Sequence, residues 1–219
     1  MLAVRTIAIA ATLLALASPA AAMYPNDPAS VARPLATPQL FGYELPVAEP
    51  LLLEPDLMPG APRAYRAGVH EGIDFRAPYG MPVRAARDGI VVRIDRQYVE
   101  WSAEELAAAL AAAVRAQATP PDVLDRIRGR QVWIDHGDGV VTRYAHLSKV
   151  AALGVGERVT AGEVVGNVGA LGYPQGGPHL HFEIRVGDGY LGEGLSGEEV
   201  GYALARAFSA SSGLALRAR

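Results

Sequence analysis

Four of the five histidines of this chain lie in three short motifs. These motifs are His-Glu-Gly-Ile-Asp from His70 to Asp74, Tyr-Ala-His-Leu around His146, and Pro-His-Leu-His-Phe-Glu around His179 and His181. Imidazole and carboxylate are the ligands that zinc takes where thiolates are absent, and the chain contains no cysteine. The set therefore predicts a zinc site with additional histidines beside it.

The His-x-His motif fits an extended strand. Side chains alternate along a strand, so His179 and His181 point to the same face. One of them could bind a metal while the other stands beside it. Glu183 shares that face. It is either an acceptor that orients an imidazole from behind or an ordinary carboxylate at the edge of a strand, and the pattern leaves both open.

His70 and Asp74 lie four residues apart, with Gly72 between them. A central glycine argues against the interior of a helix, so we expect an extended segment with both side chains on one side. Together with His181 they would make three protein ligands. Three ligands leave a fourth position for water, which is typical of catalytic rather than structural zinc. A purely structural zinc would also leave two histidines unexplained.

His146 is expected on a strand over residues 140–147, where it would share a face with Thr142 and Tyr144. A histidine near a metal but not bound to it can act as a general base, or as a donor to a developing oxyanion. Tyr144 could act by the same route, although a packing role is the favoured interpretation. His136 lies in a glycine-rich turn and is interpreted as a turn residue.

These motifs resemble those of the lysostaphin-type zinc endopeptidases, also called the LytM family, which cut peptide bonds in bacterial peptidoglycan. The resemblance covers roughly residues 65–185 apart from a helical insertion. It also rests on Gly80-Met-Pro-Val83 and His136-Gly-Asp-Gly139. It implies zinc as the cofactor and a five-residue site. In that site the metal ligands are His70, Asp74 and His181, and the catalytic residues are His146 and His179.

Most of the segment 69–186 predicts short strands separated by turn residues. The expected strands cover residues 82–86, 89–94, 131–136, 140–147 and 179–186. Gly137-Asp138-Gly139 predicts a hairpin turn between the third and fourth of them. The expected fold class is therefore mainly β. The resemblance implies a compact antiparallel sheet or sandwich of the lysostaphin-type peptidase fold, with an inserted helical segment and a C-terminal helix.

Two helices are predicted within an insertion over about residues 97–129. The residues from Ser102 to Glu105 are typical of a capping box, which marks the start of a helix. The alanine-rich run that follows, to about Ala116, favours a helix. A second short helix is expected from the Thr119-Pro120-Pro121-Asp122 segment to near Gly129. The loop 169–177 is the other departure from the family pattern. Both segments are expected to border the groove, and the insertion is left open as a lid, a dimer contact or the dock of a regulatory partner.

The two ends of the chain carry signals of their own. Arg5, an apolar run from Ile7 to Ala17 and Ala20-Ala21-Ala22 predict a cleaved signal peptide over residues 1–22. The apolar run is short for a bilayer span of about 20 residues, so we expect no stable membrane insertion after cleavage. At the other end, Ser196 to Glu199 predicts a helix that packs on the sheet.

The predicted organisation is a signal peptide (1–22), a proline-rich arm (23–64), a peptidase domain (65–186) and a C-terminal helical tail (187–219). Nine of the sixteen prolines lie in the arm. The run Leu51-Leu52-Leu53 favours an arm docked on the domain, and a simple tether is the alternative. The formal net charge of -3 gives no reason to expect nucleic-acid binding.

The function predicted from these observations is a secreted zinc metalloendopeptidase, periplasmic or extracellular, that hydrolyses stem peptides or cross-bridges of peptidoglycan. The alternative is a non-catalytic or latent peptidoglycan-binding regulator of another cell-wall hydrolase. The intact set of five residues favours the enzyme. An arm or an insertion that covered the groove would favour the regulator.

Overall fold

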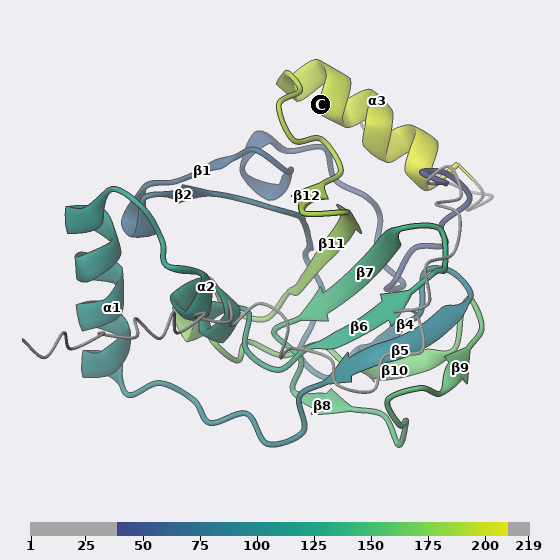
Figure 1. The fold of residues 1–219 in the computed structure, drawn as a ribbon, viewed down its shortest axis with the longest axis horizontal. Coiled ribbons are helices and arrows are strands. Elements are labelled where there is room, and N and C mark those ends of the chain that lie inside the picture. The colour runs from purple at the N-terminus through teal and green to yellow at the C-terminus, as the bar shows by residue number, and fades with distance from the viewer. Residues whose placement is uncertain (1–38, 210–219) are drawn as a thin grey trace, which may run out of the picture. The chain divides into compact units, whose positions relative to one another are not determined.

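The computed structural model describes residues 39–209. The predicted signal peptide (1–22), the first part of the proline-rich arm (23–38) and residues 210–219 lie outside the described residues. Within the described range every pair of named strands is antiparallel, and the elements are those of a mainly β protein with three α-helices (Figure 1). The predicted fold class is therefore confirmed.

The larger sheet has seven strands in the order β12-β11-β7-β6-β5-β9, and β3 also pairs with β11. These strands are β3 (Ile73–Phe75), β5 (Gly89–Ile94), β6 (Val132–Asp135), β7 (Val140–Ala145), β9 (Arg158–Val159), β11 (Leu180–Val186) and β12 (Gly189–Tyr190). A three-stranded sheet has the order β4-β10-β8, with β4 (Pro82–Arg84), β8 (Lys149–Val150) and β10 (Val164–Asn167). A two-stranded sheet joins β1 (Pro62–Arg63) to β2 (Gly68–Val69).

The two faces of the large sheet differ in chemistry. Phe182 and Tyr144 are cross-strand partners on β11 and β7, and both are fully buried in the apolar core. Because side chains alternate along a strand, the residues between them face the other way. Glu183 and its cross-strand partner Arg143 lie on that second face, with Trp133 beside them on β6. One face therefore makes the core, and the other carries charged groups.

The helical insertion forms as expected. Helix α1 (Ala103–Ala116) begins with Ser102 as N-cap in a capping box with Glu105, and α2 (Pro121–Ile127) begins with prolines that cannot donate to a preceding turn. In Figure 1, α1 and α2 lie on one side of the strands and are well separated from α3. Three short 3-10 turns, η3 (Pro55–Leu57), η4 (Ala64–Arg66) and η5 (Pro174–Gly176), complete the described elements.

The C-terminal helix α3 (Gly197–Ala207) packs on the core as predicted. Its capping box is formed by Ser196 and Glu199. Val200 and Leu204 face inward with 1% exposure each, and Phe208, just after the helix, is fully buried. The Phe208 ring lies edge-on to Phe75 and Tyr43 and tilted against Phe182, at centroid distances of 5.9–6.4 Å.

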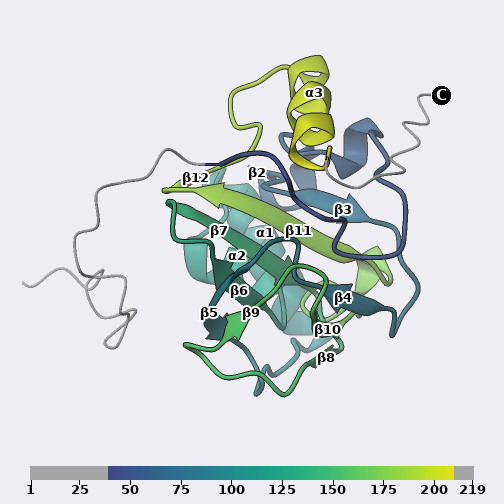
Figure 2. The same cartoon turned by 90° about the vertical axis from the view of Figure 1, so that its right-hand side faces the viewer.

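The described part of the arm is built into the core rather than tethered. Tyr43, Val47 and Leu51 are all buried. The backbone N–H of Tyr43 donates to the carbonyl of Ala207 (2.9 Å), which ties the arm to the end of α3 (Figure 2). Of the three leucines, Leu51 enters the core, and Leu53 packs against it while partly exposed. In residues 39–209 no helix is long and apolar enough to cross a bilayer.

Phe208 connects the arm, α3 and β11, so its truncation tests this packing. We expect Phe208→Ala to lower the free energy of unfolding by about 3–5 kcal/mol, because a large cavity opens where four rings meet. Chemical denaturation measures the change. Tyr202 on the same helix is 70% exposed, and Tyr202→Ala should change stability by less than about 0.5 kcal/mol. Equal effects for the two variants would contradict this account of α3.

Candidate metal centre

The pairing of β3 with β11 brings the first two predicted ligands together. In the antiparallel register, His181 on β11 lies directly opposite Asp74 on β3. Residues opposite each other in such a pair project to the same face with their Cβ atoms about 5 Å apart. The His181 Nδ1 and Asp74 Oδ1 atoms are accordingly 2.9 Å apart. The local strand register therefore positions a carboxylate against an imidazole.

His70 is held beside this pair by the loop between β2 and β3. Its backbone N–H donates to Ala61 (2.8 Å), and its carbonyl accepts from Gly60 (2.8 Å), which anchors the residue from both sides. Gly72 lets the loop lie against β11. A Cβ atom at position 72 would lie 2.4 Å from the Phe182 carbonyl oxygen and 3.0 Å from His181 Cε1. Glycine is needed here for close approach.

Three side-chain atoms converge at this point. His70 Nε2, His181 Nδ1 and Asp74 Oδ1 are each 2.9 Å from the other two. A tetrahedral zinc with ligand distances of about 2.0–2.1 Å separates its ligand atoms by about 3.3 Å. Both imidazoles are buried. Two neutral imidazoles and a carboxylate at this spacing fit zinc, and His70, Asp74 and His181 are a potential metal-binding group in the described chain.

The far nitrogen of each imidazole has an acceptor. His70 Nδ1 donates to the Met58 carbonyl oxygen (3.0 Å), and His181 Nε2 donates to Glu183 Oε1 (2.9 Å). A nitrogen that donates in this way carries the proton, so the other nitrogen keeps its lone pair for a metal. The two interpretations left open for Glu183 are thereby decided in favour of an acceptor that orients His181.

The titration properties of the three groups fit a metal site. Burial alone would raise the pKa of Asp74, but the neighbouring His70 and His181 hold that pKa well below its ordinary value. Burial lowers the pKa of His70. Burial also acts to lower the pKa of His181, but its hydrogen bonds to Asp74 and Glu183 outweigh this and raise it. At neutral pH the site therefore offers an ionised carboxylate and at least one neutral imidazole.

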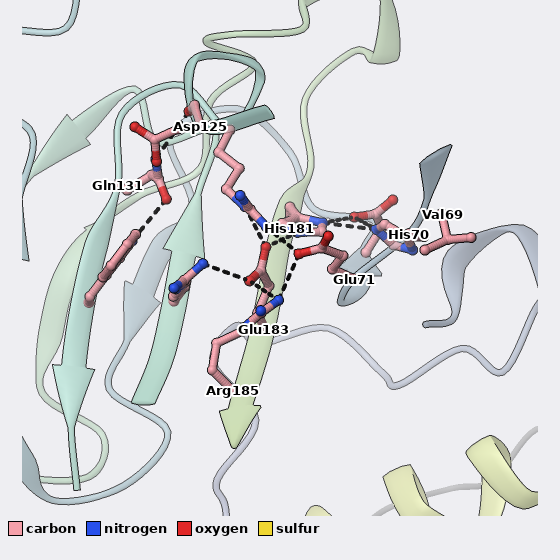
Figure 3. A network of polar contacts seen from close by, with 12 residues as sticks. Val69, His70, Glu71, Asp125, Gln131, His181, Glu183 and Arg185 are labelled. Carbon is pink, nitrogen blue, oxygen red and sulfur yellow. Dashed lines mark hydrogen bonds and ion pairs between the residues drawn. The ribbon is translucent and has the colours of Figure 1, made fainter. Parts of the chain in front are cut away.

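Glu183 belongs to a buried cluster of charges behind the site. Its side chain is fully buried, and it accepts from Arg128 Nε at 2.6 Å. Figure 3 shows Glu183 on β11 between His181 and Arg185, with Glu71 facing them. Burial alone would raise the pKa of Glu183, but the charge of Arg128, first among its neighbours, holds it far below its ordinary value. The carboxylate behind His181 is therefore ionised.

His146 reaches the site by a route that the strand pattern did not predict. Strand β7 ends at Ala145, and His146 adopts the left-handed conformation with φ of 59°. The expectation that His146 shares a face with Tyr144 is therefore wrong. Tyr144 points into the core, where its hydroxyl accepts from the Ala86 N–H (2.8 Å). The left-handed turn instead brings the His146 ring within 5.8 Å of the His181 ring.

His146 and His179 form a second pair beside the three potential ligands, with ring centroids 4.6 Å apart. His146 Nδ1 donates to the Leu171 carbonyl (2.8 Å), and His179 Nδ1 donates to the Gly177 carbonyl (2.9 Å). Each ring is thus left with Nε2 free. His179 Nε2 lies 3.8 Å from Asp74 Oδ1, outside the group of three. Burial, and then the charges of the neighbouring imidazoles, hold the pKa of His146 well below its ordinary value.

The five predicted site residues line one cavity of about 690 Å³. Its walls include Leu124, Ile127 and Arg128 from the insertion and Tyr173, Gly176 and Gly177 from the loop 169–177. Both departures from the family pattern therefore border the cavity, as expected. At its rim the rings of Tyr65 and Tyr173 stack at 4.9 Å. His136 does not line this cavity and hydrogen-bonds Asp88 and Thr142.

Comparison with known proteins identifies the family. The model of peptidase family M23 matches residues 68–192, which is more than half of the chain. The chain belongs to peptidase family M23. This family of peptidases is zinc-dependent, so the resemblance to lysostaphin-type enzymes and the predicted zinc cofactor are confirmed at the level of the family.

Several M23 relatives are known by name. The chain is 36% identical over 119 residues to a DD-carboxypeptidase/endopeptidase of Neisseria meningitidis, a match that covers 54% of this chain and 20% of the relative. It is 32% identical over 126 residues to a peptidoglycan DD-endopeptidase of Vibrio cholerae, covering 57% and 22%. A zinc-containing peptidase from Vibrio cholerae, known from a crystal structure, is 29% identical with a TM-score of 0.39, covering 56% and 28%. The matches thus span between 20% and 28% of the length of these relatives.

Sequence reasoning did not find the groups that support the site from outside the motifs. These are the Met58 carbonyl behind His70, the Leu171 carbonyl behind His146, and Arg128 behind Glu183. Main-chain carbonyls carry no signal in a sequence. Arg128 lies in the insertion, where no motif marks it. Arg63 lies in the arm, and its Nη2 is 3.3 Å from Asp74 Oδ2. It too was missed, because no motif marks it.

The close approach at Gly72 gives the first test of the metal centre. We expect Gly72→Ala to weaken zinc binding at least about tenfold, because the new Cβ would displace β11 and the imidazole of His181 that β11 carries. Competition with a chromogenic chelator measures the affinity. Gly197 at the start of α3 has open space around it, so Gly197→Ala is a matched control. Wild-type affinity in Gly72→Ala would contradict the proposed ligand geometry.

Zinc affinity should fall on acidification, because protons compete for the imidazole nitrogens of the ligands. The raised pKa of His181 means that the loss should begin above the ordinary imidazole pKa of about 6.5. Asp74 stays ionised through this window, since its pKa is lowered. Zinc titrations between about pH 7.5 and about pH 5, with circular dichroism to verify folding, measure the effect. Equal affinity at both ends would show that the ligands do not include these histidines.

Proposed function

We propose that this M23 peptidase is an exported zinc metalloendopeptidase that hydrolyses peptide bonds in the stem peptides or cross-bridges of bacterial peptidoglycan. His70, Asp74 and His181 bind the zinc, and His146 and His179 are the catalytic residues. The substrate class is supported by the Vibrio cholerae relative, which is named as a peptidoglycan DD-endopeptidase. Export is supported by the signal-peptide pattern of residues 1–22 and fits a substrate outside the cytoplasm.

The observation that carries the proposal is the convergence of five side chains on one cavity. Three of them meet within 2.9 Å of one another, and two more imidazoles stand beside them with free Nε2 atoms. A structural zinc would take all its ligands from the protein, whereas this group provides three and leaves a position open. The three residues line a cavity of about 690 Å³, which is large enough for a peptide segment.

The two free imidazoles suit different tasks in peptide hydrolysis. Zinc supplies a Lewis acid that polarises a carbonyl and lowers the pKa of water. His146 Nδ1–H is engaged by Leu171, so its Nε2 carries a lone pair and can take a proton as general base. Its lowered pKa keeps that nitrogen unprotonated at neutral pH. His179 Nδ1–H is engaged by Gly177, and its Nε2 lies 3.8 Å from Asp74 Oδ1. As an imidazolium, His179 would donate from Nε2–H to charge that develops on the substrate oxygen.

The structure bears on the alternative of a latent or non-catalytic regulator. The described part of the arm, residues 39–64, and the insertion contribute Leu57 and Arg128 to the wall of the cavity. The arm also supplies the Met58 carbonyl that orients His70. Shortening the chain before about Pro59 would therefore damage the metal centre, so truncation cannot separate latency from inactivity. Point variants within the site make a sharper distinction.

The deciding experiment is mass spectrometry of peptidoglycan incubated with the zinc-loaded protein that lacks residues 1–22, with and without a zinc chelator. We expect new peptide fragments that disappear with the chelator, and their masses identify the bond that is cut. His181→Ala serves as the zinc-free control. Intact peptidoglycan from a protein shown to carry zinc would reject the enzyme and favour the regulator.

The role of His146 can be separated from metal binding. We expect His146→Ala to retain zinc but to lose a factor of roughly 10²–10⁴ in the rate of peptidoglycan cleavage, because the general base is absent. Metal analysis of the purified variant confirms that zinc is present, and fragment release over time gives the rate. Full activity with bound zinc would rule out a role for His146 in proton transfer.

A further inference from the structure

The helical insertion ends at a residue that reaches the metal centre. Helix α2 ends at Ile127, and Arg128 follows as its C-cap residue. The Arg128 side chain is 8% exposed. It does not point to solvent but toward β11, where Nε donates to Glu183 Oε1 (2.6 Å) and Nη2 donates to Glu71 Oε2 (2.7 Å). The guanidinium therefore bridges two carboxylates in the interior.

Arg128 and His181 share one oxygen of Glu183. Oε1 accepts from Arg128 Nε at 2.6 Å and from His181 Nε2 at 2.9 Å. Two other arginines contact the opposite oxygen, Oε2, at longer distances of 3.4 Å for Arg143 and 3.5 Å for Arg185. Arg128 thus makes the short contact, and makes it on the oxygen that orients the imidazole. An unbroken chain of polar contacts runs from the insertion through Glu183 to His181.

The backbone at the same point contacts the other histidine pair. The Arg128 carbonyl accepts from the His146 N–H (2.8 Å). The next residue, Gly129, lies so close to the loop that a Cβ atom there would be 2.1 Å from the Leu171 carbonyl oxygen. That carbonyl in turn accepts from His146 Nδ1. The end of the insertion therefore touches His146 directly at its backbone and, through Leu171, at its ring.

We infer that Arg128 is a positioning residue which, by fixing Glu183, holds the His181 imidazole with Nδ1 toward His70 and Asp74 and so sets the affinity of the site for zinc. The inference rests on the proposed assignment of His181 as a metal ligand. It gives the insertion a function within the site.

Without Arg128, Oε1 of the buried Glu183 carboxylate loses its shortest cationic contact, while Arg143 and Arg185 remain on Oε2 at 3.4 Å and 3.5 Å. A fully buried carboxylate turns toward the cations that are left to it. That movement draws Oε1 away from His181 Nε2 and weakens the hydrogen bond that Glu183 accepts. The His181 ring is then free to rotate or to move its proton to Nδ1, and a protonated Nδ1 cannot bind a metal. Loss of such supporting contacts typically lowers metal affinity about 10–100-fold.

The test compares three variants of the protein lacking residues 1–22. We expect Arg128→Gln to weaken zinc binding by about 10–100-fold in competition with a chromogenic chelator. Arg128→Lys should fall between wild type and Arg128→Gln, because lysine keeps the charge but not the fork that reaches both carboxylates. Arg126→Gln is the matched control. Arg126 lies on the same helix, but it stacks on Trp101 and pairs with Glu105 at the surface, so its loss should leave zinc affinity unchanged.

A second readout separates positioning from a purely structural role. Nitrogen-15 NMR of the His181 ring in the metal-free protein, recorded at a pH where the ring is neutral, reports which nitrogen carries the proton. We expect Nε2–H in wild type and Arg126→Gln, and loss of that preference in Arg128→Gln. If Arg128→Gln lowers only the melting temperature, with zinc affinity and the His181 tautomer unchanged, the inference is overturned. Should Arg128→Gln fail to fold, the same two measurements on Arg128→Lys decide, and wild-type values in both overturn it.

These outcomes are distinct from failure of the proposed function. A protein that binds zinc through His181 but does not cleave peptidoglycan would reject the function, while the effect of Arg128→Gln on zinc affinity would still stand. Conversely, if His181→Ala binds zinc as well as wild type does, the ligand assignment fails, and the inference about Arg128 fails with it.

Discussion

The convergence of two imidazoles and a carboxylate within 2.9 Å of one another is the constraint on which the rest of this structure depends. When both imidazoles donate from their outer nitrogens, the three atoms that face one another all carry lone pairs, and burial removes the water that could donate to them. A bound cation resolves the conflict, but only if each ring presents its lone pair inward. The ligands therefore need fixed partners on their outer sides, and the surrounding elements supply them.

Those partners come from the two segments that lie outside the motifs. The arm contributes the Met58 carbonyl behind His70, and the insertion contributes Arg128 behind Glu183. Burying Glu183 with several arginines is costly, and apolar residues of similar size would often serve stability as well or better. An apolar replacement, however, could not accept a proton from His181. The cluster is thus better explained by the needs of the metal centre than by the stability of the fold, and the arm and insertion are parts of the site.

The strand that carries His181 and the starts of the helices could be predicted from the sequence, because each is determined by residues that are close together in the chain. Alternation places His181 on β11 and His179, just before that strand, toward one side, and capping boxes at Ser102 and Ser196 mark where α1 and α3 begin. The supports of the site could not be predicted in this way. The Met58 carbonyl is present in every possible sequence at that position. Arg128 meets Glu183 across 55 positions of sequence, which no periodicity encodes.

The wrong prediction for His146 shows why residues of a functional site can depart from the alternation of side chains along a strand. Alternation along β7 would have placed its imidazole in the apolar core beside Tyr144, where neither catalysis nor hydration is available. A single residue with φ of 59° turns it to the opposite face. A non-glycine residue held in such a sparsely populated region costs of order 1–3 kcal/mol and persists only when its surroundings fix it. Here the Arg128 carbonyl holds its backbone and the Leu171 carbonyl its ring. The insertion therefore stabilises the conformation that brings His146 to the metal centre.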